Sequence, residues 1–308
     1  MNETGDLEVA VAILALIRAG RTGPAGAIEF LRKLAASGNA DLTVSEVLAA
    51  FGTSQPSVNG SLSTSRRDLE SGLVKGIVPI PLSSMRYPST LRLLPDAPPI
   101  LHVRGNLNVL SKLPGVAVVG TRKATQHGLT IAQRISTYLS ENGIVVVSGL
   151  ALGVDAAAHE GALLGREPTI AVLAHGLERA SPRANEPLAM RILETGGLWV
   201  SEHAMGVSAR PEHFVHRNRI QIGLSSASVI VEGEQKSGSA MQAEYCLRYK
   251  RELFAVLPDS ASPVSTQSQL PRMLVKQRGA HAIVSRESYP ELLEIAARKR
   301  QELLGPLQ

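Results

Sequence analysis

The sequence predicts an α/β protein in which a doubly wound, mostly parallel sheet follows a small all-helical N-terminal domain. Two observations support this prediction. After about residue 75, short runs of Val, Ile, Ala and Leu alternate with helical patterns, which is typical of parallel strands covered by helices on both faces. Before that point, apolar side chains recur at helical spacing instead. We therefore divide the chain into residues 1–75 and residues 76–308.

The N-terminal part is expected to contain three helices and a linker. Residues 7–20 have an apolar side chain at every third or fourth position, which predicts an amphipathic helix. A second helix is expected to begin at Pro24, because proline is favoured in the first helical turn. A third is expected after Thr43, which stands three residues before Glu46 in the spacing of a capping box. Residues 53–68 are rich in Ser, Thr, Asn and Gly and predict a linker.

The second domain is expected to contain seven strands, separated for the most part by helices. The predicted strands are residues 115–120, 144–149, 169–176, 198–202, 227–233, 252–258 and 281–285. Their near-continuous apolar character indicates burial on both faces, as in a Rossmann-like sheet. In such sheets ligands bind outside the carboxyl ends of the strands, so the residues that follow each strand are the candidates for function.

The charge of the chain is concentrated in the sheet domain. The chain has 308 residues and a net charge of +5, with a pI near 9.5. Residues 1–75 carry 7 Lys and Arg against 8 Asp and Glu, whereas the remaining residues carry 25 against 19. The sheet domain can therefore accept a polyanion such as nucleic acid. The helical module has no basic face, and we expect it to serve partner binding or self-association.

The sequence favours a cytoplasmic protein without a membrane segment. No apolar run approaches eighteen residues, the length that predicts a membrane span, and the N-terminus lacks the pattern of an export signal. The single cysteine, Cys246, cannot form an internal disulfide, and its helical surroundings predict a buried, reduced thiol.

Cations, hydroxyl groups and glycines follow five successive strands of the predicted sheet. These candidate site residues are Gly120, Thr121, Arg122 and Lys123 after the first strand, Ser148, Gly149 and Gly153 after the second, Arg183 after the third, Arg217, Asn218 and Arg219 in a long loop after the fourth, and Lys236, Ser237, Gly238 and Ser239 after the fifth. Guanidinium groups and backbone N–H groups at helix N-termini both bind phosphate. Their coincidence at one sheet edge predicts a site for several phosphates.

Some of these residues have simpler alternative roles. One arginine of the Arg217–Arg219 segment could instead form a structural ion pair that ties its loop to Glu202 or Glu232. Asp155 and His159 share a helix face, but no third ligand is visible, so we expect packing or capping rather than a metal site.

Several classes of function compete for this sheet edge. A dinucleotide-dependent dehydrogenase is disfavoured because GTRKATQHG replaces the G-x-G-x-x-G fingerprint. A binder or hydrolase of a small nucleotide is the main alternative, and a pure interaction protein is another. No nucleophile–base pair or carboxylate cluster is evident, so we expect neither catalysis nor a cofactor. Aromatic residues make up only 3% of the chain, and Phe214 is the main candidate for stacking on a base.

Seven segments of the chain carry a family resemblance. They are GVAVVGTR, VVVSGLALGVDAAAH, TIAVLAHGLERASPRAN, SEHAMG, HFVHRNRIQIGLS, VIVEGEQKSGS and RELFAV, in this order. The chain resembles the DNA-processing protein A family, also called DprA or Smf, over about residues 75–285. The resemblance implies a Rossmann-like homodimer that binds single-stranded DNA without cutting it. It also implies loading of a RecA-type recombinase, notably during natural transformation.

The resemblance implies the same site that the charges indicate. The family's glycine–hydroxyl–arginine turn falls on residues 120–122, its Ser-Gly turn on residues 148–149, its RNR motif on residues 217–219 and its Ser-Gly-Ser turn on residues 237–239. Its basic position after the third strand falls on Arg183. The expected anion is then the phosphate backbone of a DNA strand, bound largely without regard to sequence.

Overall fold

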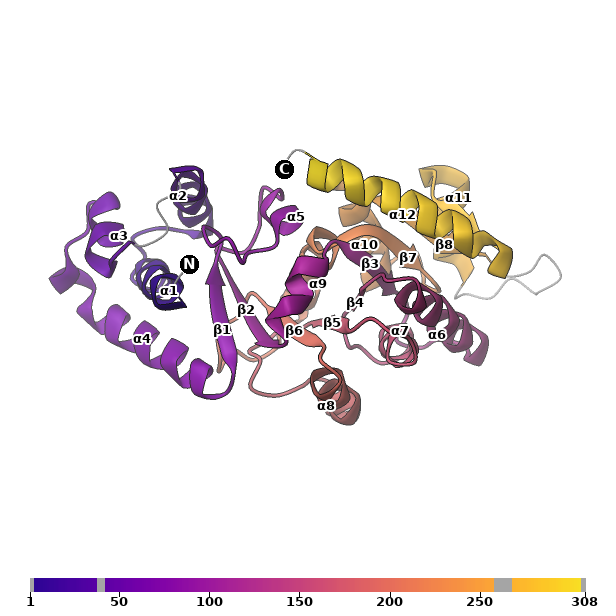
Figure 1. Cartoon of the computed structure of the whole chain (residues 1–308), viewed down its shortest axis with the longest axis horizontal. Helices are drawn as coiled ribbons and strands as arrows, with labels where there is room; N and C mark the ends of the chain where they lie inside the picture. Colours follow the sequence, from indigo (N-terminus) through magenta and orange to yellow (C-terminus); the bar gives the residue numbers. More distant parts are fainter. Residues whose placement is uncertain (1–2, 38–41, 258–267, 306–308) are drawn as a thin grey trace.

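A mostly parallel nine-stranded sheet forms the centre of the protein. The computed structural model describes residues 3–37, 42–257 and 268–305. Across the sheet the strand order is β1-β2-β6-β5-β4-β3-β7-β8-β9, with helices on both faces (Figure 1). The β1–β2 and β2–β6 pairs are antiparallel, and the remaining pairs are parallel. The predicted α/β class with a mostly parallel, Rossmann-like sheet is confirmed.

The elements have the following bounds. The strands are β1 (Ile77–Pro81), β2 (Ile100–Gly105), β3 (Gly115–Val119), β4 (Val146–Ser148), β5 (Thr169–Val172), β6 (Leu198–Ser201), β7 (Ser225–Ile230), β8 (Glu252–Val256) and β9 (His281–Ile283). The α-helices are α1 (Glu3–Arg18), α2 (Pro24–Ser37), α3 (Val44–Ala50), α4 (Asn59–Val74), α5 (Ser89–Arg92), α6 (Gln126–Glu141), α7 (Val154–Ala162), α8 (Glu186–Glu194), α9 (Pro211–Gly223), α10 (Gly238–Arg248), α11 (Gln269–Arg278) and α12 (Tyr289–Leu304). Short 3-10 turns include η1 (Gln55–Val58), η2 (Leu107–Lys112), η3 (Arg183–Asn185) and η5 (Arg286–Ser288).

The order of the strands reverses at β3. From β3 the chain adds β4, β5 and β6 on one side, and then returns to add β7, β8 and β9 on the other. The crevice outside the carboxyl ends of β3 and β7 is therefore the topological switch point, where α/β proteins bind their ligands. The turns after these two strands are residues 120–125 and 231–237.

The two faces of the sheet carry separate cores. Side chains alternate between the faces along each strand. Val118 of β3 therefore joins a cluster with α6, α7 and α12, whereas Val119 joins a cluster with α9, α10 and α11. These helices hold both sides of the switch point in place.

The Ser-rich segment predicted as a linker is helical, so that prediction is wrong. Residues 55–58 form η1, and α4 follows directly. Leu62 and Leu69 of α4 are 8% and 3% exposed. Arg18 of α1 pairs with Asp68 at 2.8 Å. In the sequence, polar residues between the leucines obscure the apolar spacing of this helix. A helix of low intrinsic propensity still forms when one of its faces packs against another element, and here that element is α1.

The helices before residue 75 share one hydrophobic core with the sheet. The cluster runs from α1 through β1 and β2 to β6. Asp6 of α1, which is 5% exposed, accepts hydrogen bonds from Ser84 at 2.8 Å and Arg86 at 2.7 Å. The division of the chain at residue 75 therefore stays a prediction.

Three elements after residue 75 differ from expectation, namely β1, β2 and α9. The sequence analysis found no strand before residue 115, yet β1 and β2 extend the sheet there. Proline is tolerated at a sheet edge, so Pro79 and Pro81 of β1 masked a true edge strand. The long loop expected after residue 202 ends early, because α9 begins at Pro211 and carries the RNR motif on a helix.

No helix among residues 3–37, 42–257 and 268–305 combines the length and apolar character that a membrane crossing requires.

The helical nature of residues 59–74 can be tested with two leucines of α4. We expect Leu69→Ala to lower the free energy of unfolding by about 2–5 kcal/mol, because Leu69 is 3% exposed and its removal leaves a cavity. Leu73→Ala is the matched control, since Leu73 is 38% exposed and should change stability by no more than about 0.5 kcal/mol. Denaturant unfolding measures both; equal, negligible effects would restore the linker interpretation.

Candidate functional site

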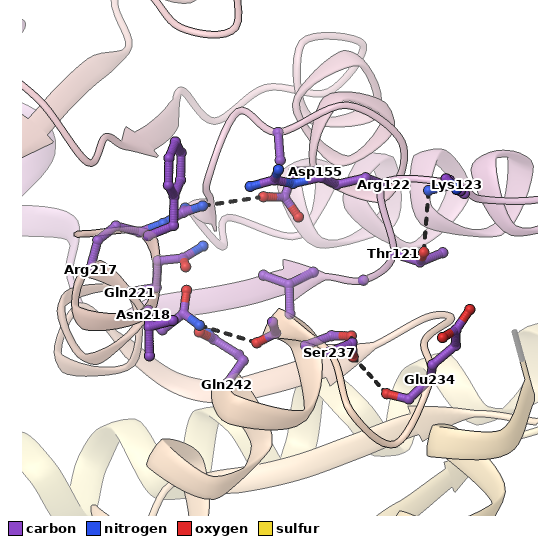
Figure 2. Close-up of a pocket in the computed structure, with 17 residues that line it drawn as sticks. Thr121, Arg122, Lys123, Asp155, Arg217, Asn218, Gln221, Glu234, Ser237 and Gln242 are labelled. Carbon is purple, nitrogen blue, oxygen red and sulfur yellow. Dashed lines mark hydrogen bonds and ion pairs between the residues drawn. The ribbon is translucent and has the colours of Figure 1, made fainter. Parts of the chain in front are cut away.

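A cavity of about 390 Å³ lies at the topological switch point (Figure 2). Its walls come from the turn after β3, the start of α7, helix α9 and the start of α10. Ten of the sequence-predicted residues line it, namely Gly120, Thr121, Arg122, Lys123, Phe214, Arg217, Asn218, Ser237, Gly238 and Ser239. The other six, Ser148, Gly149, Gly153, Arg183, Arg219 and Lys236, do not.

The turn after β3 presents two exposed cations. Arg122 and Lys123 are both exposed, and neither has an ion-pair partner within the described ranges. The Arg122 guanidinium lies 5.1 Å from the centre of the Phe214 ring, which orients it without neutralising its charge. The Thr121 hydroxyl accepts a hydrogen bond from the Lys123 backbone N–H at 3.2 Å. This turn can bind an anion at the mouth of the cavity.

The start of α10 forms another anion-binding part of the wall. Ser237 is the N-cap of this helix, and its hydroxyl accepts a hydrogen bond from the Ala240 N–H at 3.3 Å. The Ser237 and Ser239 hydroxyls lie 2.9 Å apart. Asn218 of α9 donates to the Gly238 carbonyl at 3.2 Å and so ties the two helices together. The positive end of the α10 dipole therefore faces the cavity.

A buried ion pair lies in the cavity wall between α7 and α9. Arg217 and Asp155 are each 5% exposed, with 3.9 Å between the Arg217 Nη2 and Asp155 Oδ2 atoms. Arg217 also donates from Nη1 to the Val172 carbonyl at 3.1 Å. Burial raises the pKa of Asp155, opposed by the Arg217 charge and by backbone N–H groups, and burial also lowers the pKa of Arg217. The charge of Arg217 is thus balanced within the wall by Asp155.

Three small residues after β4 make room for this arrangement. Ser148 is fully buried and donates to the Val118 carbonyl at 2.7 Å. A Cβ on Gly149 would overlap the Arg217 guanidinium. Gly153 has a φ of +81°, and a Cβ there would overlap the Thr121 carbonyl. These residues do not line the cavity, but they pack directly against residues that position its wall.

Arg219 is held by a structural ion pair. Its Nη1 and Nη2 atoms donate to Glu202 at 2.9 and 2.7 Å, and its Nε atom donates to the Asp96 carbonyl at 3.0 Å. The side chain is 7% exposed. Arg219 therefore adopts the alternative structural role, with Glu202 as its partner.

Two further cations lie outside the cavity. Arg183 begins η3 and is exposed; Asn185 anchors that turn by donating to the Leu150 carbonyl at 2.9 Å. Lys236 is exposed in the turn before α10. Within the part of the chain that the structure describes, neither cation has an ion-pair partner. They can extend a path for an anion beyond the cavity.

Two glutamines of the cavity wall were missed by the sequence analysis. Gln221 and Gln242 line the cavity from α9 and α10. Gln221 follows Arg217 by four residues and Gln242 follows Ser239 by three, so each shares a helix face with a predicted site residue. That helical spacing is the signal that could have found them.

The histidine and the cysteine singled out in the sequence are buried. His159 is fully buried with its Nδ1 atom 2.8 Å from the Thr169 hydroxyl, and burial lowers its pKa to about 3. Cys246 is fully buried too, which raises the pKa of its thiol. In the described parts of the chain, no group of three or more His, Cys, Asp or Glu side chains is placed to hold a metal ion.

The close packing of Gly149 against Arg217 can be tested by one methyl group. We expect Gly149→Ala to lower the free energy of unfolding by about 1–3 kcal/mol, because the methyl group displaces a buried guanidinium. Gly60→Ala is the control: Gly60 is an exposed residue of α4 with nothing near its missing Cβ, and alanine is not expected to destabilise the protein there. Thermal and denaturant unfolding measure both, and an undisturbed Gly149 variant would contradict the close packing.

Comparisons with known proteins show which family the sequence and the fold resemble. The sequence model of the DNA recombination-mediator protein A family matches residues 79–294. The chain is 36% identical to DNA processing protein DprA of Bacillus subtilis over 219 residues, which cover 71% of this chain and 72% of that protein.

Two solved structures are similar as well. The crystal structure of DprA from Streptococcus pneumoniae superposes with a TM-score of 0.71 at 29% identity, covering 90% of this chain and 95% of that one. The structure of DNA processing protein A from Helicobacter pylori, which describes its single-stranded DNA binding mode, has a TM-score of 0.61 at 30% identity and covers 67% of this chain and 93% of that one. The family model spans both walls of the cavity as well as most of the sheet, and the chain therefore belongs to the DNA recombination-mediator protein A family.

Proposed function

We propose that this protein binds single-stranded DNA through the cavity at the switch point. The observation that carries the proposal is the convergence of two exposed cations and a helix N-terminus on one cavity. All of these groups favour anions, and several phosphates in succession would satisfy them together. The Helicobacter pylori relative of similar fold, which is described by its single-stranded DNA binding mode, supports the same ligand class.

The strand would be held mainly by its phosphates. Arg122 and Lys123 stand at the mouth of the cavity, and Arg183 and Lys236 lie at the same sheet edge beyond it. Phosphate contacts are independent of sequence and weaken as the salt concentration rises. Phe214 already has Arg122 over its ring, which leaves less of it for stacking on a base.

Membership of the family also supports a protein partner, a RecA-type recombinase. We propose that the protein protects single strands in the cytoplasm and helps to load a RecA-type recombinase onto them during DNA processing, in transformation or recombination. We also propose that it acts as a homodimer, in which one strand could cross two cavities.

The first test of this function is the salt dependence of DNA binding. We expect Arg122→Ala and Arg183→Ala to weaken binding to all oligonucleotide sequences alike. Each substitution should reduce the magnitude of the slope of log affinity against log salt by roughly 0.7 for every phosphate that the protein no longer neutralises. Fluorescence anisotropy with a labelled oligonucleotide at several salt concentrations measures the slope.

The control for the salt titration is Arg298→Ala. Arg298 is exposed on α12 and does not line the cavity, so its slope should equal that of the wild type. Equal slopes for all four proteins would mean that the strand does not cross this edge. A small nucleotide would then become the favoured ligand, and thermal shifts with nucleotides would test it.

We also propose that the protein binds DNA without cutting it and does not hydrolyse ATP. Glu234 lines the cavity and is exposed. Two other carboxylates there have structural partners: Asp155 pairs with Arg217, and Glu232 accepts hydrogen bonds from the Thr125 N–H at 2.9 Å and the Thr125 hydroxyl at 2.6 Å. Neither is free to act as a general base. We expect no conversion of labelled single strands or of ATP by the pure protein; turnover that disappears in Asp155→Asn or Glu232→Gln would refute this.

A further inference from the structure

A second cavity, of about 400 Å³, lies between helices α6 and α12, and we refer to it as the α6–α12 cavity. The two helices pack against each other on one face of the sheet (Figure 1). The walls of the cavity come from the second half of α6, the turn after α7, the η5 turn and the start of α12. None of the described residues that line it also lines the cavity at the switch point. The two cavities are therefore separate sites.

The lining of the α6–α12 cavity offers apolar surface. The Tyr138 and Tyr289 rings meet there, with their centres 5.3 Å apart. The Thr137 hydroxyl is satisfied within the protein, because it donates to two backbone carbonyls at 2.8 and 3.0 Å. Leu164 also lines the cavity and is 63% exposed. An exposed leucine beside tyrosine rings can be covered by a bulky apolar side chain of a partner.

Two arginines of the lining carry unpaired charges. Arg134 of α6 and Arg286 of η5 are both exposed. Neither has an ion-pair partner among the residues that the structure describes. Burial raises the pKa of Tyr289, and the charges of Arg286 and Arg134 both oppose that rise, so the two guanidinium groups act on the same ring. Guanidinium groups placed in this way favour carboxylates, which they bind through charge-assisted hydrogen bonds.

Nearby carboxylates limit the kind of anion that fits. Glu141 lines the cavity from α6, seven residues after Arg134 and thus about 10 Å farther along the helix. Glu287 is not part of the lining and accepts a hydrogen bond from the Ser285 hydroxyl. A DNA strand has a phosphate at every nucleotide and would bring one of them toward Glu141. A peptide can place carboxylates at the arginines and a neutral residue beside Glu141.

We propose that the α6–α12 cavity docks a short acidic peptide segment of another protein. One bulky apolar side chain of the peptide lies against Tyr138, Tyr289 and Leu164, and its flanking carboxylates pair with Arg134 and Arg286. Charge complementarity selects an acidic partner, and the apolar side chain adds buried surface at the centre of the contact. This inference goes beyond DNA binding and does not depend on it, because the two cavities share no described lining residue.

The test measures the affinity of defined peptides by fluorescence anisotropy. The probe is a labelled peptide with two Asp residues on each side of one Phe; one matched peptide has Asn in place of every Asp, and the other has Ala in place of Phe. The protein variants are Arg134→Ala, Arg286→Ala and Glu141→Gln. Arg298→Ala is the control, since Arg298 is exposed on α12 and does not line this cavity. All four substitutions change exposed side chains and should retain wild-type thermal stability.

We expect the wild type to bind the Asp–Phe peptide at least about 5-fold more tightly than either matched peptide, because each matched peptide loses charge-assisted hydrogen bonds or apolar burial. Arg134→Ala and Arg286→Ala should each weaken this binding by about 5-fold or more, the loss expected for one charge-assisted contact. Glu141→Gln should strengthen it, and Arg298→Ala should leave it unchanged. Equal affinities for the three peptides, or equal losses in all three arginine variants, would overturn the docking site.

Oligonucleotide binding by the same variants separates a peptide site from a DNA site. Arg134→Ala and Arg286→Ala should bind single-stranded DNA as the wild type does, with the same dependence on salt. If they weakened DNA binding as much as peptide binding, the cavity would belong to the path of the strand and the docking proposal would be wrong. Failure of the wild type to bind any strand would contradict the proposed function and leave the peptide result in place.

Discussion

The buried pair of Arg217 and Asp155 is the interaction on which the rest of the site depends. It joins the start of α7 to the middle of α9, and α9 also carries Asn218 and Gln221 into the cavity. An ion pair with little solvent is stable only when its neighbours are packed and polar enough to compensate for the missing hydration. The carbonyl of Val172 and the backbone N–H groups near Asp155 provide that compensation. The close approach of the Arg217 guanidinium also explains why residue 149 in the turn after β4 is a glycine.

Arginines of one sheet edge acquire different roles from their surroundings. Arg219 donates its hydrogen bonds to Glu202 and to a backbone carbonyl. Arg217 forms an ion pair with Asp155 and donates to a backbone carbonyl of β5. Arg122 is exposed to solvent and lies over an aromatic ring. A guanidinium that already has a carboxylate partner gains little from a phosphate, whereas an exposed one exchanges bound counterions for it. The exposed cations of the cavity are thus available to an anion, whereas its buried guanidinium is fixed in place by a carboxylate.

The sequence allowed the parallel strands and the ends of β3 and β7 to be predicted, because apolar runs and the residues after them follow local rules. Ten of the sixteen residues expected at the site line one cavity. The edge strand β1 and helix α4 were missed because their apolar pattern is interrupted by Pro79 and Pro81 in β1 and by many serines in α4. The partner of Arg219 depends on a contact between distant segments, which no local pattern contains.

The prolines of β1 have a consequence for how copies of this chain can meet. At the free edge of a sheet, exposed N–H and C=O groups invite a strand from a neighbouring molecule. Pro79 and Pro81 lack the N–H donor, helices α1 and α4 lie against the same strand, and at the opposite edge of the described sheet β9 is only three residues long. Neither border of the described sheet is a template for β-sheet continuation between molecules. Self-association that leaves this fold intact must instead bring together the side chains of helices or loops, so its strength would depend on shape complementarity rather than on backbone pairing.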